Sequence, residues 1–194
     1  AEHVETVPVM TDDRICFFTD TGSMYQVKAA DVPAGKLKDK GVPLDNISRF
    51  EGAKERILLT MPASELSGKK LLFATRAAML KIVPGGEFLT ANRMVAATKL
   101  SEGDQAAEIR ILSGETEIVL QTKEGMFLRF MINEIPELKK NSRGVRGMKL
   151  EDGDSLEHVY FPENEPLAVY KEKEVHLNRL KMAKRDGKGT KTRV

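Results

Sequence analysis

The sequence repeats itself, and this restricts its fold more than any other feature. An apolar run, a Thr, a short polar turn and a second apolar run follow one another three times. The three copies read ICFFTDTGSMYQVKAADVP from Ile15, LLFATRAAMLKIVPGGEFL from Leu71 and IVLQTKEGMFLRFMINEIP from Ile118. Their threonines, Thr19, Thr75 and Thr122, are 56 and 47 residues apart. A period near 50 residues indicates one small structural unit that is stacked several times.

A second phrase repeats together with the first. Residues 141–150, NSRGVRGMKL, match residues 91–100, ANRMVAATKL, and each phrase is followed by an acidic turn that contains Gly. The matched residues differ in number by 50; Arg93 and Arg143 are one such pair, and Lys99 and Lys149 are another. A weaker fourth copy of the first phrase, PLAVYKEKEVHLNRL, begins at Pro166.

Each copy predicts four β-strands. The first phrase predicts a hairpin in which residues 14–19 pair with residues 24–28, because β-branched and aromatic residues flank a short turn with Gly22. The second phrase predicts a third strand, a turn and a fourth strand. The fourth strands are expected at 54–60, 105–112 and 156–161, and single helical turns at 46–50 and 63–66. Four-stranded repeats predict an all-β, propeller-like fold of about four antiparallel sheets.

The repeats set the expected boundaries of a single domain over residues 1–194. Repeats are expected at 14–62, 69–113 and 116–162, and a partial repeat with a basic tail at 166–194. Residues 1–13 resemble only the last strand of a preceding repeat. This strand either closes the last sheet of a ring or shows that the sequence is a piece of a longer protein, and both alternatives stay open.

These phrases resemble the C-terminal β-pinwheel repeats found in the A subunits of the bacterial type IIA topoisomerases, DNA gyrase and topoisomerase IV. The resemblance covers essentially the whole chain. It departs from gyrase in one respect, because no basic Gln-Arg-Arg-Gly-Gly-Arg-Gly box occurs in the sequence. The missing part of the first repeat would lie just upstream of Glu2, which also explains this absence. The sequence KRDGKGTKTRV at residues 184–194 reads as a natural C-terminus and slightly favours topoisomerase IV over gyrase, and both alternatives stay open.

The resemblance implies a domain without catalysis that binds and bends double-stranded DNA, and so steers the capture of DNA segments. It implies an A2B2 enzyme in which ATP and Mg²⁺ belong to the partner B subunit, so no cofactor is expected in this domain. The alternative is a propeller-like scaffold that binds another protein and not DNA.

Positive charge recurs at the repeat period, in the loops that precede the third strands. The candidate DNA-binding residues are Lys36, Lys38, Lys40, Arg93, Lys139, Lys140, Arg143, Arg146, Lys184, Arg185 and Lys188. Cations at matching places on successive sheets favour contact with phosphates rather than with bases. Gly144 and Gly147 are expected to allow the backbone to approach a phosphate closely.

Other kinds of site find no support in the sequence. The acidic stretch at residues 151–154 is interpreted as a β-turn and not as a metal site, because the remaining ligands of a calcium loop are missing. Cys16, the one cysteine, is expected to be a buried thiol. No apolar run is long enough to span a membrane, and no signal peptide is evident, so a cytoplasmic protein is expected.

Overall fold

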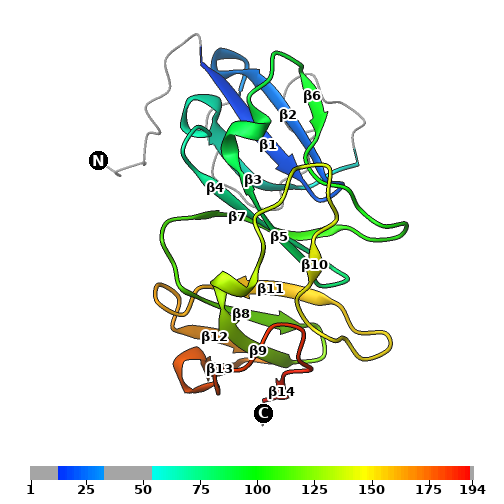
Figure 1. Cartoon of the computed structure of the whole chain (residues 1–194), viewed down its shortest axis with the longest axis vertical. Helices are drawn as coiled ribbons and strands as arrows, with labels where there is room; N and C mark the ends of the chain where they lie inside the picture. Colours follow the sequence, from blue (N-terminus) through cyan, green and yellow to red (C-terminus); the bar gives the residue numbers. More distant parts are fainter. Residues whose placement is uncertain (1–12, 33–53, 193–194) are drawn as a thin grey trace.

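The computed structural model describes residues 13–32 and 54–192, and in these residues the fold is all-β. Three sheets have four antiparallel strands and one has two. In spatial order, the first sheet contains β3 (Ile57–Pro62), β1 (Arg14–Thr19), β2 (Ser23–Lys28) and β6 (Met94–Ala96). The second sheet contains β10 (Val145–Arg146), β5 (Met79–Pro84), β4 (Lys70–Thr75) and β7 (Ala106–Leu112). The third sheet contains β11 (Leu156–Tyr160), β8 (Glu117–Thr122), β9 (Met126–Met131) and β14 (Thr190–Lys191), and the last contains β12 (Leu167–Tyr170) and β13 (Lys173–His176). The sheets follow one another along the molecule (Figure 1), which confirms the predicted propeller-like stack.

Each four-stranded sheet takes one strand from the following repeat. β6 comes after β5 in the chain, yet it pairs with β2 of the first sheet. In the same way β10 pairs with β5, and β14 pairs with β9. The hairpin and fourth strands stay together as predicted, since β1 pairs with both β2 and β3. The third strands therefore link neighbouring sheets by exchange.

Short 3-10 turns start the chain's departure from each sheet. η1 (Ala29–Asp31), η4 (Gly85–Phe88), η5 (Ile132–Glu134) and η6 (Leu177–Arg179) directly follow the second strand of a hairpin. η3 (Ala63–Glu65) confirms the single helical turn predicted at 63–66. Among the residues that the structure describes, no helix is long and apolar enough to cross a bilayer.

The repeated Thr holds the hairpin turn. The hydroxyl of Thr75 accepts the Met79 N–H at 3.1 Å, and the hydroxyl of Thr122 accepts the Met126 N–H at 3.0 Å. Three residues after each Thr the backbone has a positive φ, and Gly125 supplies this conformation without strain at +83°. The spacing from Thr to Gly therefore reflects one turn geometry.

Sheets pack face to face, and their hairpin strands are buried on both sides. Phe18 of the first sheet lies edge-on to Phe88 beside the second sheet, with ring centroids 5.1 Å apart. Leu80 of the second sheet and Phe130 of the third belong to the next cluster. Burial on both faces explains why the sequence shows continuous apolar runs in the hairpins instead of alternation.

Some predictions fall outside the described residues: the strand at 1–13 apart from Asp13, the helical turn at 46–50, and the candidates Lys36, Lys38 and Lys40.

Candidate nucleic-acid interface

The exchanged strands form one edge of three successive sheets. β6, β10 and β14 are each the outermost strand beside the second strand of a hairpin. Backbone hydrogen bonds join the segments around them end to end: the Lys99 N–H donates to the Ser142 carbonyl at 3.3 Å, and the Lys149 N–H donates to the Gly187 carbonyl at 2.8 Å. We call residues 91–100, 141–150 and 184–191 the edge track.

The edge track is strongly basic. Its Lys and Arg residues are Arg93, Lys99, Arg143, Arg146, Lys149, Lys184, Arg185, Lys188 and Lys191. Its one acidic residue is Asp186. All of these cations are exposed except Arg185, which is half-buried. The edge track thus brings six candidates that were predicted on successive repeats to one continuous edge: Arg93, Arg143, Arg146, Lys184, Arg185 and Lys188.

Three cations on this edge were missed by the sequence reasoning: Lys99, Lys149 and Lys191. Lys99 and Lys149 occupy matching positions 50 residues apart, shortly after β6 and β10. That recurrence is visible in the sequence, but these lysines follow the third strands, whereas the cations were predicted in the loops before them. The exchange of strands places the residues after these strands on the same edge.

Two of the predicted arginines, Arg146 and Arg185, make contacts that join two segments of the edge track. The Arg146 guanidinium forms an ion pair with the Asp186 carboxylate, through Nε to Oδ1 and through Nη2 to Oδ2 at 3.1 Å. This contact lowers the pKa of Asp186 and raises the pKa of Arg146. Arg185 Nη1 donates to the Arg146 carbonyl at 2.7 Å. These side chains connect the third and fourth repeats, so they have less freedom to reach a ligand than Arg143.

Lys139 and Lys140 directly precede the second segment of the edge track and differ in their surroundings. Lys140 is half-buried, and its Nζ donates to the Glu87 carbonyl at 3.2 Å. Its N–H donates to Glu87 Oε1 at 3.1 Å. Lys139 is exposed. Of the two predicted lysines, Lys139 is thus the one whose ammonium faces solvent.

The glycines near β10 serve the packing of the strands. A Cβ on Gly144, whose φ is +93°, would lie 2.4 Å from the Leu80 carbonyl oxygen. A Cβ on Gly147 would lie 2.4 Å from a Leu80 methyl group. The close approach that these glycines permit in the structure is therefore to β5, and their predicted approach to a phosphate stays a prediction.

The acidic turns hold the hairpin turns and confirm the β-turn interpretation. Asp104 Oδ1 accepts the Ala77 N–H at 3.0 Å, and Asp154 Oδ1 accepts the Glu124 N–H at 3.0 Å. Within the described part of the chain, no group of three or more His, Cys, Asp or Glu side chains is arranged to hold a metal ion.

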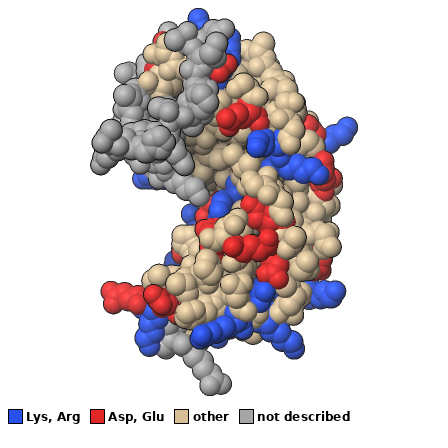
Figure 2. All heavy atoms as spheres, turned by 90° about the vertical axis from the view of Figure 1, so that its left-hand side faces the viewer, with Lys and Arg blue, Asp and Glu red and all other residues tan. Residues whose placement is uncertain are grey.

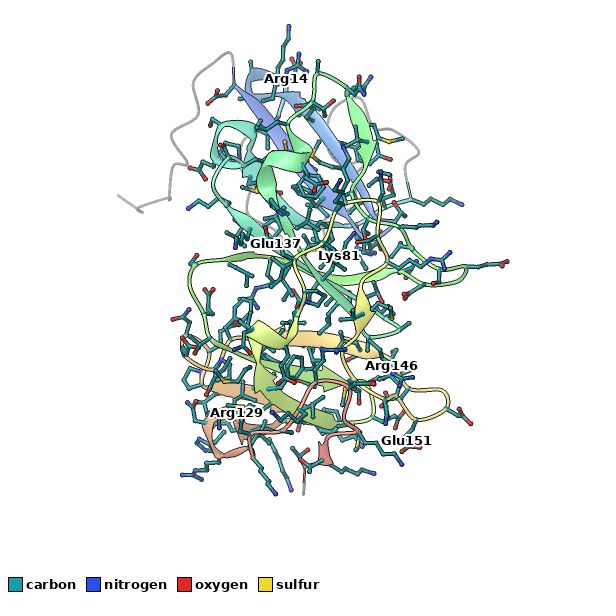
Figure 3. All side chains as sticks on the ribbon, viewed as in Figure 1. Arg14, Lys81, Arg129, Glu137, Arg146 and Glu151 are labelled. Atoms are coloured by element: carbon teal, nitrogen blue, oxygen red, sulfur yellow. The ribbon has the colours of Figure 1, made fainter. Side chains whose placement is uncertain are left out.

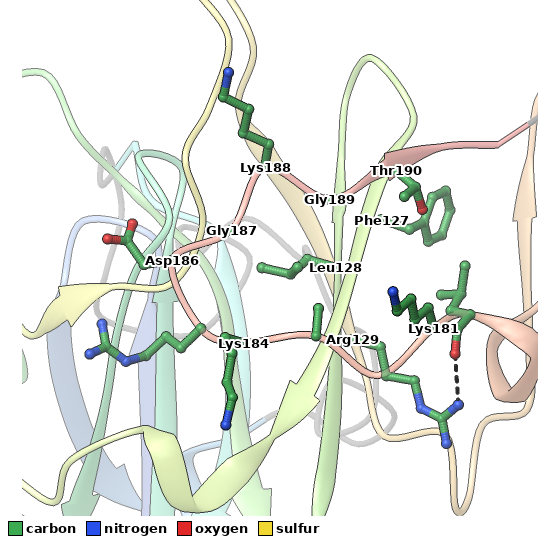
Figure 4. A pocket seen from close by; sticks show the side chains of 13 residues that line it. Phe127, Leu128, Arg129, Lys181, Lys184, Asp186, Gly187, Lys188, Gly189 and Thr190 are labelled. Atoms are coloured by element: carbon green, nitrogen blue, oxygen red, sulfur yellow. Dashed lines mark hydrogen bonds between the residues drawn. The ribbon is translucent and has the colours of Figure 1, made fainter.

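A cavity of about 360 Å³ lies where the chain returns to β9 (Figure 4). Phe127 and Leu128 form part of its wall, and Lys184 and Lys188 come from the edge track.

On the face shown in Figure 2, acidic side chains gather near the middle, while most Lys and Arg side chains lie towards its margins. On this face, positive charge thus lies mainly at the margins.

Comparison with known proteins identifies the family. The model of the DNA gyrase C-terminal domain, described as a β-propeller, matches residues 13–49, 69–113 and 116–162. The A subunit of DNA gyrase from Staphylococcus aureus (strain MRSA252) is 29% identical over 199 residues, covering 97% of this chain and 22% of that protein. Its counterpart in strain NCTC 8325 / PS 47 is 28% identical over the same length, with the same coverage of both chains. The chain thus spans about a fifth of the length of these relatives.

Solved structures share the fold. The C-terminal domain of a DNA topoisomerase IV has a TM-score of 0.73 at 23% identity, covering 93% of this chain and 58% of that one. A DNA gyrase A C-terminal domain has a TM-score of 0.69 at 22% identity, covering 94% and 60%. The ParC C-terminal domain of E. coli has a TM-score of 0.68 at 17% identity, covering 100% and 87%. The repeats, the stack of sheets and the match over three segments together show that this chain belongs to the family of the DNA gyrase C-terminal domain, a β-propeller.

Proposed function

We propose that the edge track binds double-stranded DNA through its phosphates and bends it along the stack of sheets. The observation that carries the proposal is the charge of this edge: nine Lys and Arg residues and one Asp lie on segments joined end to end. Duplex DNA carries about one charge per 1.7 Å of its axis, so such an edge meets a phosphate wherever a cation projects. This binding reads no base sequence.

Bending follows from the arrangement of the sheets. A duplex that contacts all three segments of the edge track must follow this edge from one sheet to the next. Bending about 20 to 30 base pairs by 40 to 90° costs on the order of 1 to 6 kcal/mol. Several phosphate contacts offset a cost of this size, because each one releases counterions from the DNA.

In the whole protein, this domain would steer which DNA segment reaches the strand-passing machinery of a type IIA topoisomerase in the cytoplasm. We place catalysis, ATP and Mg²⁺ elsewhere in that A2B2 enzyme, and assign to this domain binding to DNA and to the rest of the A and B subunits. The membership in the gyrase family supports this assignment. The chain boundaries proposed for the repeats are 14–62, 69–113 and 116–162, with a partial repeat at 166–194.

Charge reversal on the edge track tests the proposal. Lys99→Glu combined with Lys149→Glu removes two exposed cations that make no side-chain hydrogen bond to a described residue. Fluorescence anisotropy with unrelated duplexes should show similar losses of affinity for all of them. The slope of log K against log salt should become shallower by about 2, because each phosphate contact contributes about 0.9. Energy transfer between dyes on the DNA ends should show less bending.

A matched control separates position from net charge. Arg14→Glu combined with Lys69→Glu makes the same change in charge at exposed residues beside the first hairpin strands, away from the edge track. This pair should lose much less affinity. Equal losses in both pairs would show a nonspecific effect of charge and reject the edge track. If the unaltered protein has no affinity for DNA at low salt, the propeller-like protein scaffold becomes the better explanation.

A further inference from the structure

Lys81 of β5 is buried, although its side chain carries an ammonium group. Lys81 is 1% exposed, and its Nζ lies 5.4 Å from the centre of the Phe73 ring. The ammonium donates to three backbone carbonyls: Lys139 at 3.2 Å, Lys140 at 2.9 Å and Ser142 at 2.6 Å. A lysine ammonium has three N–H donors, so all of them are used. Figure 3 shows Lys81 in the middle of the molecule, next to the chain segment that leads to β10.

The three acceptors lie where two segments of the edge track meet. The Ser142 carbonyl, which receives the shortest bond from Lys81, also accepts the Lys99 N–H and the Thr98 hydroxyl, both at 3.3 Å. The same loop carries exposed Lys139 and leads directly to exposed Arg143. Lys81 thus holds, from the core side, the loop that carries exposed Lys139 and leads to exposed Arg143.

The neighbouring sheets use comparable donors from the second hairpin strand. Gln26 Nε2 donates to the Thr90 carbonyl at 2.6 Å and the Asn92 carbonyl at 2.5 Å. Arg129 Nη1 donates to the Asn178 carbonyl at 3.0 Å and the Leu180 carbonyl at 2.9 Å. At each of the three described connections between sheets, a polar side chain of the second hairpin strand therefore donates hydrogen bonds to the chain segment that leads to the exchanged strand. The donor thus recurs at the same place in successive repeats.

Lys81 differs from these two donors in its charge. Gln26 is neutral, and the charge of Arg129 is compensated by Glu117, whose oxygens lie 3.0 and 2.8 Å from Arg129 Nη2. No carboxylate of a described residue bonds to Lys81; the charged groups beside it are Glu87 and Lys140. Burial lowers the pKa of Lys81 to about 8, and the charge of Glu87 opposes this shift. The loop carbonyls are thus the hydrogen-bonding environment that keeps a buried cation in place.

We propose that Lys81 is a positioning residue of the DNA interface: its buried ammonium holds loop 139–142 in the shape that presents Lys139 and Arg143 together to DNA phosphates. This inference rests on the proposed function. Lys81 itself does not touch DNA, because it is buried beneath the loop that it holds. Its contribution to affinity is carried by other residues.

The experiment replaces Lys81 by a side chain of similar length without donors. Lys81→Met removes a buried charge, so a residue without a positioning role should leave the salt dependence of DNA binding nearly unchanged. We expect instead that the slope of log K against log salt becomes shallower by about 2, since two loop cations lose their phosphates. Lys139→Met is the matched control, which should reduce the slope by about 1 because it removes one exposed cation. Lys81→Arg retains the charge and several donors, and should recover part of the lost slope.

A double-mutant cycle measures the coupling directly. Arg143→Ala should weaken binding about 10-fold in the unaltered protein and less than about 2-fold in Lys81→Met, because the misplaced loop no longer presents Arg143. Equal fold-changes in both backgrounds, with a slope that Lys81→Met does not alter, would overturn the positioning role. That result would leave the proposed function intact, because the unaltered protein still binds DNA.

A measurement on the unaltered protein covers the case in which Lys81→Met fails to fold or no DNA binding is found. With lysine ¹⁵N-labelled at Nζ, one ammonium should exchange its protons slowly and show a pKa far below those of the other lysines. On adding duplex, the signal of exposed Lys139 in the loop should shift, whereas this protected signal should remain. If all the ammonium groups exchange at the rate of exposed lysines, the anchor does not exist and the inference is wrong, whatever the DNA assay shows.

Discussion

Gly144→Ala tests the close packing of the edge track on the neighbouring sheet. The φ of +93° at Gly144 costs an alanine about 1 to 2 kcal/mol. The added Cβ would also lie 2.4 Å from the Leu80 carbonyl oxygen, where ordinary contact begins at 3.4 Å. β10 must therefore move away from β5, and it pairs with β5 through only two residues, Val145 and Arg146. Losing about two hydrogen bonds adds roughly 2 kcal/mol, for a total of about 3 to 4 kcal/mol.

Gly153→Ala is the matched control, because Gly153 has a similar φ of +79° and nothing within 4 Å of the added Cβ. It should cost only the backbone strain, about 1 to 2 kcal/mol. Urea denaturation gives both free energies of unfolding, and their difference of about 2 kcal/mol isolates the contact with Leu80. Gly144→Ala should also weaken DNA binding, whereas Gly153→Ala should not. If the two substitutions cost the same free energy, the reasoning about the packing of β10 on β5 is refuted.

Three further predictions concern the turns and the buried groups. Asp154→Ala should lower the free energy of unfolding by about 2 kcal/mol, because Asp154 accepts the N–H groups of Glu124 and Ser155, whereas exposed Asp152→Ala should change it by less than about 0.5 kcal/mol; equal effects in urea denaturation would contradict this role. Cys16 is fully buried and burial raises its pKa to about 12, so iodoacetamide should alkylate it only after unfolding, and labelling of the native protein at the rate of a free peptide would disprove the assignment. The pKa of Lys81, about 8, lies below the 10.5 of an unperturbed lysine, so between these pH values the unfolded chain binds more protons than the folded protein. From pH 8 to 10.5, the free energy of unfolding of the unaltered protein should therefore rise by up to about 3 kcal/mol relative to that of Lys81→Met. A constant difference between the two proteins would show that Lys81 is not buried.

The repeat made most of the fold predictable. The apolar runs beside Thr75 and Thr122 predicted the hairpins, because a strand between two packed sheets is apolar on both faces. The partner of the third strand was not predictable in this way. β6 and β10 are short, and their residues are exposed or half-buried, so no apolar pattern on them specifies which sheet they join. Their partner is decided by the geometry of the crossing and not by the strand itself.

The candidate site was predictable in outline only. Periodic charge pointed to Arg93 and Arg143, and the structure places both on the edge track. Sequence could not show that Arg146 would be held by Asp186, because these residues are 40 positions apart. It also could not show the role of Lys81, which reads only as a charge that interrupts an apolar run. Its three acceptors are backbone carbonyls, and these leave no trace in the residue types.

The exchange of third strands also bears on how chains of this kind change in length. An inserted copy of the unit gives its third strand to the sheet before it and offers its own hairpin edge to the copy after it, as β10 and β5 of the third and second repeats do. Duplication of a whole unit therefore needs no new complementary surface, whereas loss of half a unit leaves an unpaired edge in a sheet whose own sequence is intact. Selection should accordingly favour gains and losses of entire copies, each of which would lengthen or shorten the basic edge by one step.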